Sequence, residues 1–416
     1  MKLENIDVLF FIEHIDREMK GTLEVKKWLE QNGLTVHVAS ITFGLYQSWK
    51  RFSPKVICYP YCKKRNYAMV ELFLMRNPNV ICVNLNYEQL LAPATEYSKR
   101  PQDEFAKKEL IHFVWGQHFK NYLLKNNILE DNIKIVGKPE IQFLINMKKK
   151  QESEIRRQIA LQEKLDENKR WIFVPFNDGG AFKTKKMMEV QMQRGGFLLS
   201  DLLESIEVTQ KHLKYFFEYT SKVAKERKDV EIIYRPHPGV DVNNLYRLAE
   251  DYGLNKLPNF HIIRSYTIKE WLCSSQVCIS NWSTTMVDAQ TIGLKTYIFK
   301  PSLLSERRKA DWMEKFIPIE TLDDLRNAIG NNVDSNVKQE NYDYYIDTSE
   351  DAVERWGKTL LEYVQKYKDC GLRNSRKAYF TYFRKIVGSE YRRIAKRFDL
   401  NYKMNNSLLY DYFDVI

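Results

Sequence analysis

Arg235 and His237 lie in an Arg-Pro-His-Pro-Gly segment that directly follows an apolar run, residues 230–234. The guanidinium of arginine offers planar hydrogen-bond donors to a phosphate, and the imidazole of histidine can donate to a phosphoryl oxygen or protonate a leaving group. The prolines on either side of His237 stiffen the loop and hold both side chains in place. The segment therefore predicts a phosphate contact by Arg235 and His237, with a rigid surface turn as the alternative.

A second polar segment, Ser-Asn-Trp-Ser-Thr-Thr, ends at Thr285 and precedes a helix predicted at residues 285–292. Hydroxyls and free backbone N–H groups at a helix N-terminus form an anion site with the positive end of the helix dipole. Ser283, Thr284 and Thr285 are therefore predicted to bind a phosphate, and Asp288 to bind ribose hydroxyls from one turn further on. The alternative is an ordinary serine or threonine cap with an acidic residue that suits the dipole.

Carboxylates follow the first strand predicted in each half of the chain and are candidates for catalysis. The main candidates are Glu13 and Asp178, and Asp16 and Glu18 stand beside Glu13. Glu13 comes after residues 6–12, and Asp178 comes after residues 171–176. Group transfer to an acceptor hydroxyl needs a base, and Asp178 could also act as a nucleophile if configuration is retained. His237 joins them as the catalytic group beside the leaving phosphate. A solvated turn or a salt bridge is the alternative for each carboxylate.

Three further polar side chains near these carboxylates are predicted to bind substrate. They are Arg17, Asn177 and Lys183. Arg17 belongs to a Glu-His-Ile-Asp-Arg-Glu segment at the end of the first strand. Lys183 follows two glycines that let the backbone approach a ligand closely, and it either clamps an anionic group or faces solvent.

Apolar runs alternate with helical patterns along the chain, which is typical of parallel strands joined by crossover helices. Strands are predicted at residues 6–12, 35–40, 55–61, 79–84, 111–115 and 133–136, and then at residues 171–176, 230–234, 261–264, 277–280 and 295–299. In an open parallel sheet, ligands bind at the carboxyl ends of strands, and the polar segments lie at those ends. The pattern predicts an α/β protein with two doubly wound, Rossmann-like domains that face each other.

The 416 residues exceed the size of one usual core, so two domains are expected. Residues 151–170 are charged, helix-prone and poor in large apolar side chains, and we place the junction there. The resulting organisation is an acceptor-side domain at residues 1–150, a nucleotide-binding domain at residues 151–345 and a helical tail at residues 346–416. A cleft between the two domains is the default ligand site.

The net charge of +11 indicates an anionic partner, and much of this charge lies near the C-terminus. One stretch combines nine basic residues with interleaved aromatic residues and a single acidic residue, Glu390. The basic residues are Arg373, Arg376, Lys377, Arg384, Lys385, Arg392, Arg393, Lys396 and Arg397, and the aromatic ones are Tyr379, Phe380, Tyr382, Phe383 and Tyr391. A helix packed on the first domain, an amphipathic surface for anionic lipid and a single-strand nucleic-acid site are all compatible with this pattern. Because no recognised nucleic-acid motif accompanies it, we expect no nucleic-acid partner.

No run of about 18 uncharged apolar residues occurs, so we expect no membrane span and no signal peptide. The expected location is the cytoplasm, either free or peripheral on the inner face of the cell membrane. The six cysteines lie far apart, and neither of their two close pairs has the further ligands of a zinc site. Asp323 and Asp324 follow Thr321 as an ordinary helix start, not as a metal-binding pair. We therefore expect reduced thiols, no metal and no cofactor.

The combination of these segments resembles the bacterial surface-carbohydrate biosynthesis glycosyltransferases, which are related to Kdo transferases and, more loosely, to bacterial sialyltransferases. The resemblance spans residues 6–301 and is dense only in the second half. The matching features are Arg-Pro-His-Pro at residues 235–238, Glu270 with Trp271, the Ser-Thr-Thr segment at residues 283–285 with an acidic residue after it, and Gly-Leu-Lys at residues 293–295. Weaker matches are residues 13–18 and the Gly-Lys-Pro-Glu turn at residues 137–140. Asp288 stands where the family more usually has glutamate.

The resemblance implies a GT-B-like, metal-independent glycosyltransferase in which His237, Ser283, Thr284 and Thr285 hold the phosphate of a CMP-activated acidic keto-sugar. The donor would be of the Kdo or nonulosonic (sialic) type, and the acceptor a capsule, lipopolysaccharide or other surface glycan, free or lipid-linked. One alternative is a CDP-glycerol or CDP-ribitol polyol-phosphate transferase, which resembles the same segments. The other is a non-catalytic scaffold subunit that keeps the nucleotide-binding fold.

Overall fold

The computed structural model describes residues 3–193, 198–237, 240–330, 342–373 and 376–397. The chain divides into two compact units. The first unit comprises Met1–Gln89, Lys99–Phe143 and Asp343–Ile416, and the second comprises Leu90–Ser98 and Leu144–Tyr342. Each unit is built on its own six-stranded parallel sheet, so each is described by itself.

The sheet of the first unit has the strand order β2-β1-β3-β4-β5-β6. Its strands are β1 (Glu4–Ile12), β2 (Val36–Ser40), β3 (Phe52–Tyr59), β4 (Ile81–Asn84), β5 (Ile111–Val114) and β6 (Ile133–Ile135). Alternate residues of β1 point to opposite faces: Leu9 and Phe11 join one apolar cluster, whereas Val8, Phe10 and Ile12 join another. The continuous apolar run of β1 follows from this burial on both faces.

Helices cover both faces of this sheet, and two of them come from the end of the chain. The helices are η1 (Ile15–Met19, one π-helical turn), α1 (Lys20–Gln31), α2 (Leu45–Arg51), α3 (Ala68–Arg76), α5 (Glu104–Lys108), α6 (Gln117–Lys125), η2 (Glu130–Asn132, a 3₁₀ turn), α14 (Ala352–Lys366) and α15 (Arg376–Arg397). Two others, α4 (Pro93–Lys99) and α7 (Pro139–Glu163), contribute residues to both units.

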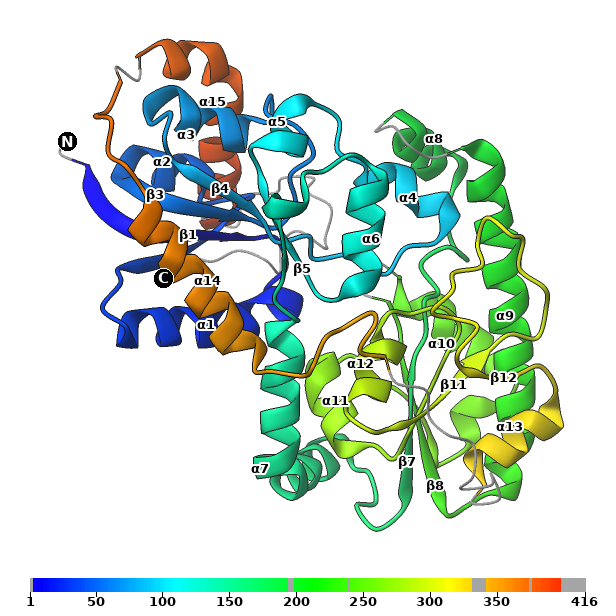
Figure 1. Cartoon of the computed structure of the whole chain (residues 1–416). Coiled ribbons are helices and arrows are strands. Elements are labelled where there is room, and N and C mark those ends of the chain that lie inside the picture. Colours follow the sequence, from blue (N-terminus) through cyan, green and yellow to red (C-terminus); the bar gives the residue numbers. More distant parts are fainter. Residues whose placement is uncertain (1–2, 194–197, 238–239, 331–341, 374–375, 398–416) are drawn as a thin grey trace. The chain divides into compact units, whose positions relative to one another are not determined.

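The helix α14 lies along α1, as Figure 1 shows, and closes one face of the first sheet. Its Trp356 is fully buried in the same cluster as Val8 and donates from Nε1 to the Gly137 carbonyl at 3.2 Å. Gly357 is needed at the contact, because a Cβ there would lie 2.1 Å from the Trp28 ring. From the sequence, residues 346–416 were predicted to form a separate helical tail. In the structure, α14 and α15 group with the first unit because both bury apolar side chains against it.

The sheet of the second unit has the strand order β12-β11-β10-β7-β8-β9. Its strands are β7 (Arg170–Pro175), β8 (Val230–Arg235), β9 (Phe260–Ile262), β10 (Val277–Ser280), β11 (Lys295–Phe299) and β12 (Ile317–Ile319). Its helices are α8 (Lys185–Gln193), α9 (Leu199–Glu226), α10 (Val242–Asp251), η3 (Leu254–Lys256, a 3₁₀ turn), α11 (Ile268–Ser274), α12 (Thr285–Thr291) and α13 (Leu322–Ile329). Thr321 and Asp324 form a capping box at the start of α13, which confirms the helix start predicted there.

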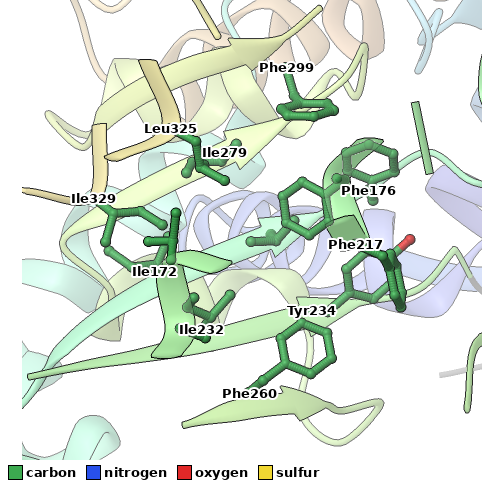
Figure 2. Packing of buried hydrophobic residues seen from close by; sticks show 14 of the residues in the cluster. Ile172, Phe176, Phe217, Ile232, Tyr234, Phe260, Ile279, Phe299, Leu325 and Ile329 are labelled. Atoms are coloured by element: carbon green, nitrogen blue, oxygen red, sulfur yellow. The ribbon is translucent and has the colours of Figure 1, made fainter. Parts of the chain in front are cut away.

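Aromatic side chains fill the core on one face of the second sheet. Figure 2 shows Phe176, Phe217, Tyr234 and Phe260 gathered there, with the Tyr234 hydroxyl at the margin of the apolar cluster. On the opposite face, Phe173 stacks on Trp271 with ring centroids 6.0 Å apart. Apolar and aromatic side chains therefore fill both faces of the sheet, and the polar side chains that could bind a ligand lie at the strand ends.

β7 and β10 are neighbours in the second sheet. The sheet continues from β7 through β8 to β9 on one side and from β10 through β11 to β12 on the other, so the strand order reverses between β7 and β10. Ligands in open α/β sheets bind beyond the carboxyl ends of strands at such a switch point. The segments after β7 and β10 are the Asn-Asp-Gly-Gly and Asn-Trp-Ser-Thr-Thr segments. The two parallel α/β sheets expected from the sequence are confirmed, and β12 is the strand that the sequence pattern did not predict.

Candidate functional site

Asp178 joins the loops that follow β7 and β8 in the second unit. Its side chain is fully buried, and each carboxylate oxygen accepts one hydrogen bond. Oδ2 accepts from the Tyr234 hydroxyl at 2.7 Å, and Oδ1 accepts from the backbone N–H of His237 at 2.9 Å. Since β7 and β8 pair with Pro175 opposite Arg235, the loops that follow them leave the sheet side by side. Asp178 therefore fixes the start of the loop that carries His237.

Burial raises the pKa of the Asp178 carboxyl from 3.8 to about 6, although the hydrogen bonds from Tyr234 and His237 oppose this rise. Between these two values the folded protein binds more protons than the unfolded chain, so stability falls as pH rises through this window. The expected loss is roughly 3 kcal/mol at about 1.4 kcal/mol per pKa unit.

We expect Asp178→Asn to remove this pH-dependent loss while keeping the shape of the side chain. The measurement is the midpoint of urea unfolding for the wild type and the variant at pH 4 and pH 7. The variant should gain stability relative to the wild type at pH 7 and match it at pH 4. An equal pH dependence of the two proteins would contradict a raised pKa at Asp178.

His237 sits directly above the glycine turn that follows Asp178. Its side chain is exposed, and a Cβ placed on Gly179 would lie 3.3 Å from Nδ1 of its ring. A Cβ on Gly180 would lie 2.8 Å from the Thr209 hydroxyl oxygen, which is closer than real Cβ atoms come. The two glycines thus let the turn pass beneath the imidazole and against α9. Pro238 and Gly239, the rest of the predicted motif, lie outside the described residues.

Asn281 joins the loop after β7 to the loop after β10. Its Oδ1 accepts from the backbone N–H of Asn177 at 2.9 Å, and its Nδ2 donates to the Asn177 carbonyl at 3.1 Å. The Ser280 hydroxyl also donates to the Pro175 carbonyl at 2.5 Å. Asn281 is buried, so this exchange of hydrogen bonds is shielded from water. Asn177 was predicted to bind substrate. Its backbone N–H and carbonyl are both hydrogen-bonded to Asn281, and its side chain is half-buried.

The hydroxyls predicted to face a phosphate lie just after this join. The Ser283 hydroxyl donates to the Thr285 hydroxyl oxygen at 3.1 Å and accepts from the Thr285 backbone N–H at 3.3 Å. Thr284 is the exposed N-cap residue of α12, and its side chain makes no capping hydrogen bond. Asp288 is half-buried in the first turn of α12. The structure thus brings the three hydroxyl-bearing residues together at one strand end.

Arg235 and Lys183 lie at the margins of the same strand ends. The half-buried Arg235 donates from Nη1 to the Ser265 carbonyl at 2.6 Å, which ties it to the loop after β9. Lys183 is half-buried after the glycine turn, and burial together with Arg308 lowers the pKa of its amino group. Each of these basic side chains offers hydrogen-bond donors to an anion.

The remaining predicted site residues, Glu13 and Arg17, belong to the first unit at the end of β1. Glu18, a further carboxylate of the same segment, is the buried centre of this group. It accepts the Glu13 backbone N–H at 2.7 Å through Oε2 and two Arg17 donors at 2.9 and 2.6 Å through Oε1. Arg17 also binds Glu88 at 3.1 Å, and burial raises the pKa of the half-buried Glu13 carboxyl. The raised pKa is compatible with the base role that the sequence predicts for Glu13.

Cysteine, histidine and acidic side chains are the further groups that could bind a metal. Five of the six cysteines are buried and all are free, with Cys370 exposed. Over residues 3–193, 198–237, 240–330, 342–373 and 376–397, no three histidine, cysteine, aspartate or glutamate side chains gather as metal ligands would. Nor does that part of the chain contain a helix long and apolar enough to span a membrane.

Neither a protein-family model nor a curated protein sequence matches this chain. Solved structures do. UDP-GlcNAc 2-epimerase from Neisseria meningitidis, bound to UDP-GlcNAc, is 14% identical with a TM-score of 0.53, over 87% of this chain and 100% of that one. A putative UDP-N-acetylglucosamine 2-epimerase from Listeria monocytogenes is 12% identical with a TM-score of 0.57, over 88% and 98%.

The wall teichoic acid polymerase TagF, in a variant with one histidine replaced by asparagine and soaked with CDPG, is also similar. It is 12% identical with a TM-score of 0.52, over 88% of this chain and 90% of that one. Identities this low concern the fold and not the activity. Together with the two parallel six-stranded sheets, they confirm the predicted fold: this chain is similar to these proteins in having a GT-B-like α/β architecture.

Proposed function

We propose that this chain is a nucleotide-dependent transferase whose donor is a CDP-linked polyol of the glycerol or ribitol type. In the reaction, an acceptor hydroxyl oxygen attacks the β-phosphorus, the bond from that phosphorus to the bridging oxygen breaks, and CMP and a proton are released. The acceptor belongs to the class of surface polymers. The observation that carries the proposal is the buried carboxylate of Asp178, which fixes His237, in the loop after β8, against the loop that leaves the switch point of a GT-B-like sheet.

Each group at these strand ends has a use in such a reaction. The imidazole of His237 and the guanidinium of Arg235 supply donors to the diphosphate, which gains charge on the departing CMP as the bond breaks. Ser283 and Thr285 add hydroxyl donors from the neighbouring loop. Asp178, with no exposed surface, is assigned to positioning, since a base or nucleophile has to reach its substrate. The base role predicted for Glu13 stays a prediction.

Two other nucleotide donors compete with this proposal. The similarity to a TagF structure soaked with CDPG favours a CDP donor, and the structures compared above give no support to the CMP-linked keto-sugar that the sequence resemblance implied. A UDP-sugar epimerase is the second candidate. It is favoured by the fold similarity to an epimerase structure that contains UDP-GlcNAc. The three readings differ in the nucleotide that they require.

A thermal-shift titration with CDP, CMP, UDP and GDP distinguishes them. We expect CDP to stabilise the protein most, by about 2.7 kcal/mol at a concentration one hundred times its Kd. Ser283→Ala should weaken the CDP effect, and Ser200→Ala, at an exposed position of α9, should leave it unchanged. Preference for UDP would support the epimerase reading and overturn the proposal, as would preference for CMP in favour of the keto-sugar reading. No response to any nucleotide would overturn it in favour of a scaffold subunit.

A further inference from the structure

The helix α15 has one face that packs on the first unit. Ala378, Tyr382 and Ile386 recur every four residues, are buried and join the apolar cluster that contains Leu9. The Tyr382 hydroxyl donates to Glu71 on α3, and Glu390 accepts from Gln47 on α2 at 2.8 Å. Figure 1 shows α15 alongside α3. The helix is therefore held in a fixed rotation about its axis.

The opposite face of α15 carries a stripe of large apolar side chains that are exposed in the part of the chain that the structure describes. Phe380 is 74% exposed, and Tyr391 is 52% exposed. The full stripe is Phe380, Phe383, Val387, Tyr391 and Ile394, all at least 44% exposed. At 3.6 residues per turn these positions fall within about a quarter of the helix circumference and point away from the buried face. The stripe belongs to the first unit, whereas the strand ends that carry the proposed function belong to the second.

The charge on α15 is strongly positive. Eight of its 22 residues are lysine or arginine and only Glu390 is acidic. Arg376, Lys377 and Arg384 are exposed, and their helical positions border or continue the apolar stripe. Glu390 is half-buried and hydrogen-bonded to Gln47, so it faces the packed side. The outward surface of α15 thus combines aromatic and aliphatic side chains with basic ones.

We propose that the outward face of α15, formed by the stripe and its three bordering basic residues, docks on an anionic phospholipid surface. Phenylalanine, tyrosine and aliphatic side chains enter the boundary between headgroups and acyl chains, and lysine and arginine pair with lipid phosphates. Juxtaposed basic residues gain affinity from the negative surface potential of such a leaflet. This docking does not depend on the nucleotide proposed above.

A lipid surface fits these residues better than a nucleic acid or a protein does. Single-strand binding uses a groove in which bases stack on aromatic rings, whereas the stripe is convex and includes Val387 and Ile394, which offer no ring. An exposed stripe along one helix lies flat in a membrane interface without a matching pocket. Binding to a partner protein would need a matching pocket on that partner, and it would not depend on lipid charge.

The test is co-sedimentation of the full chain with vesicles of phosphatidylcholine alone and of phosphatidylcholine mixed equally with phosphatidylglycerol. We expect binding to the mixed vesicles that weakens at high salt, and little binding to phosphatidylcholine. The triple variant Arg376→Glu, Lys377→Glu and Arg384→Glu should bind the mixed vesicles about 100-fold more weakly. Phe380→Ser with Phe383→Ser and Val387→Ser should lose binding to a similar extent.

The matched controls carry the same kinds of substitution at exposed positions outside α15. Charge reversal at Lys211, Lys214 and Lys225 of α9, and serine at Leu129, Leu161 and Leu303, should leave vesicle binding unchanged. Unchanged melting temperatures show that the α15 variants still fold, and the nucleotide titration reports on the proposed function independently. Equal binding to both vesicle types, equal loss in the control variants, or binding of single-stranded RNA without binding of vesicles would each overturn the proposal.

Discussion

His237→Ala should lower the rate of transfer from a CDP-linked polyol by about 100- to 10,000-fold, with a smaller change in the melting temperature. The imidazole is exposed at the end of β8, so its removal leaves no cavity. What is lost is a donor to the phosphate that carries the developing charge, and donors of this kind supply about 10²- to 10³-fold in rate, with more when a proton is also transferred. The measurement is CMP release under saturating donor.

His261→Ala is the matched control for this variant. His261 also lies in the second unit, but its Nε2 pairs with Glu231 at 2.7 Å and it takes no part in the strand-end network. We expect the control to keep its transfer rate within a few-fold of the wild type. Full activity of His237→Ala, or equal loss in both variants, would show that the imidazole does not contact the reacting phosphate.

Asp178→Ala should lower the transfer rate by about 100-fold because His237 loses its anchor. Without the carboxylate, the His237 N–H and the buried Tyr234 hydroxyl have lost their acceptor, and the loop relaxes. A displacement of about 1 Å at a positioned group costs a factor of this order. The two lost hydrogen bonds should also destabilise the fold by roughly 2 kcal/mol at pH 4, where the wild-type carboxyl is neutral.

Asp178→Asn separates positioning from direct catalysis. The asparagine oxygen can accept the His237 N–H, and its amide can donate to the Tyr234 hydroxyl oxygen, so both contacts survive with one reversed. The variant should therefore keep most of the activity that Asp178→Ala loses. If Asp178→Asn were as inactive as Asp178→Ala while remaining fully folded, the carboxylate would be the base or nucleophile that the sequence first indicated.

The sequence predicted the strands well because buried parallel strands are continuous apolar runs. Residues 6–12 and 230–234, for example, coincide with most of β1 and β8. β12 was not predicted because its middle residue is Pro318, and proline within a short apolar run argues against a strand. Packing on the first unit was one of three readings that the sequence left open for α15, whereas no local pattern assigned α14 to that unit. An amphipathic pattern indicates that a helix packs but not on which sheet.

The site could be predicted only in part. Residue types and strand ends indicated Arg235, His237 and the hydroxyls of residues 283–285. The contact between Asp178 and the backbone of His237 depends on the register of β7 and β8, which no local pattern contains. Asn281 was missed for a related reason: an asparagine after a strand is usually exposed, and only the tertiary fold buries it. Glu18 was indicated as one of the carboxylates after the first strand, but its burial also depends on the tertiary fold.

The placement of α14 and α15 has a consequence for the order in which the chain becomes folded during its synthesis. The second unit ends at Tyr342, so all of its chain is available while both helices are still to be made. The first sheet, although its strands are made earliest, keeps one face without Trp356 and the other without Tyr382 until translation passes these residues. The second unit can therefore fold before the first unit is complete. The strands of the first sheet, although they are synthesised first, are the last to be shielded from water.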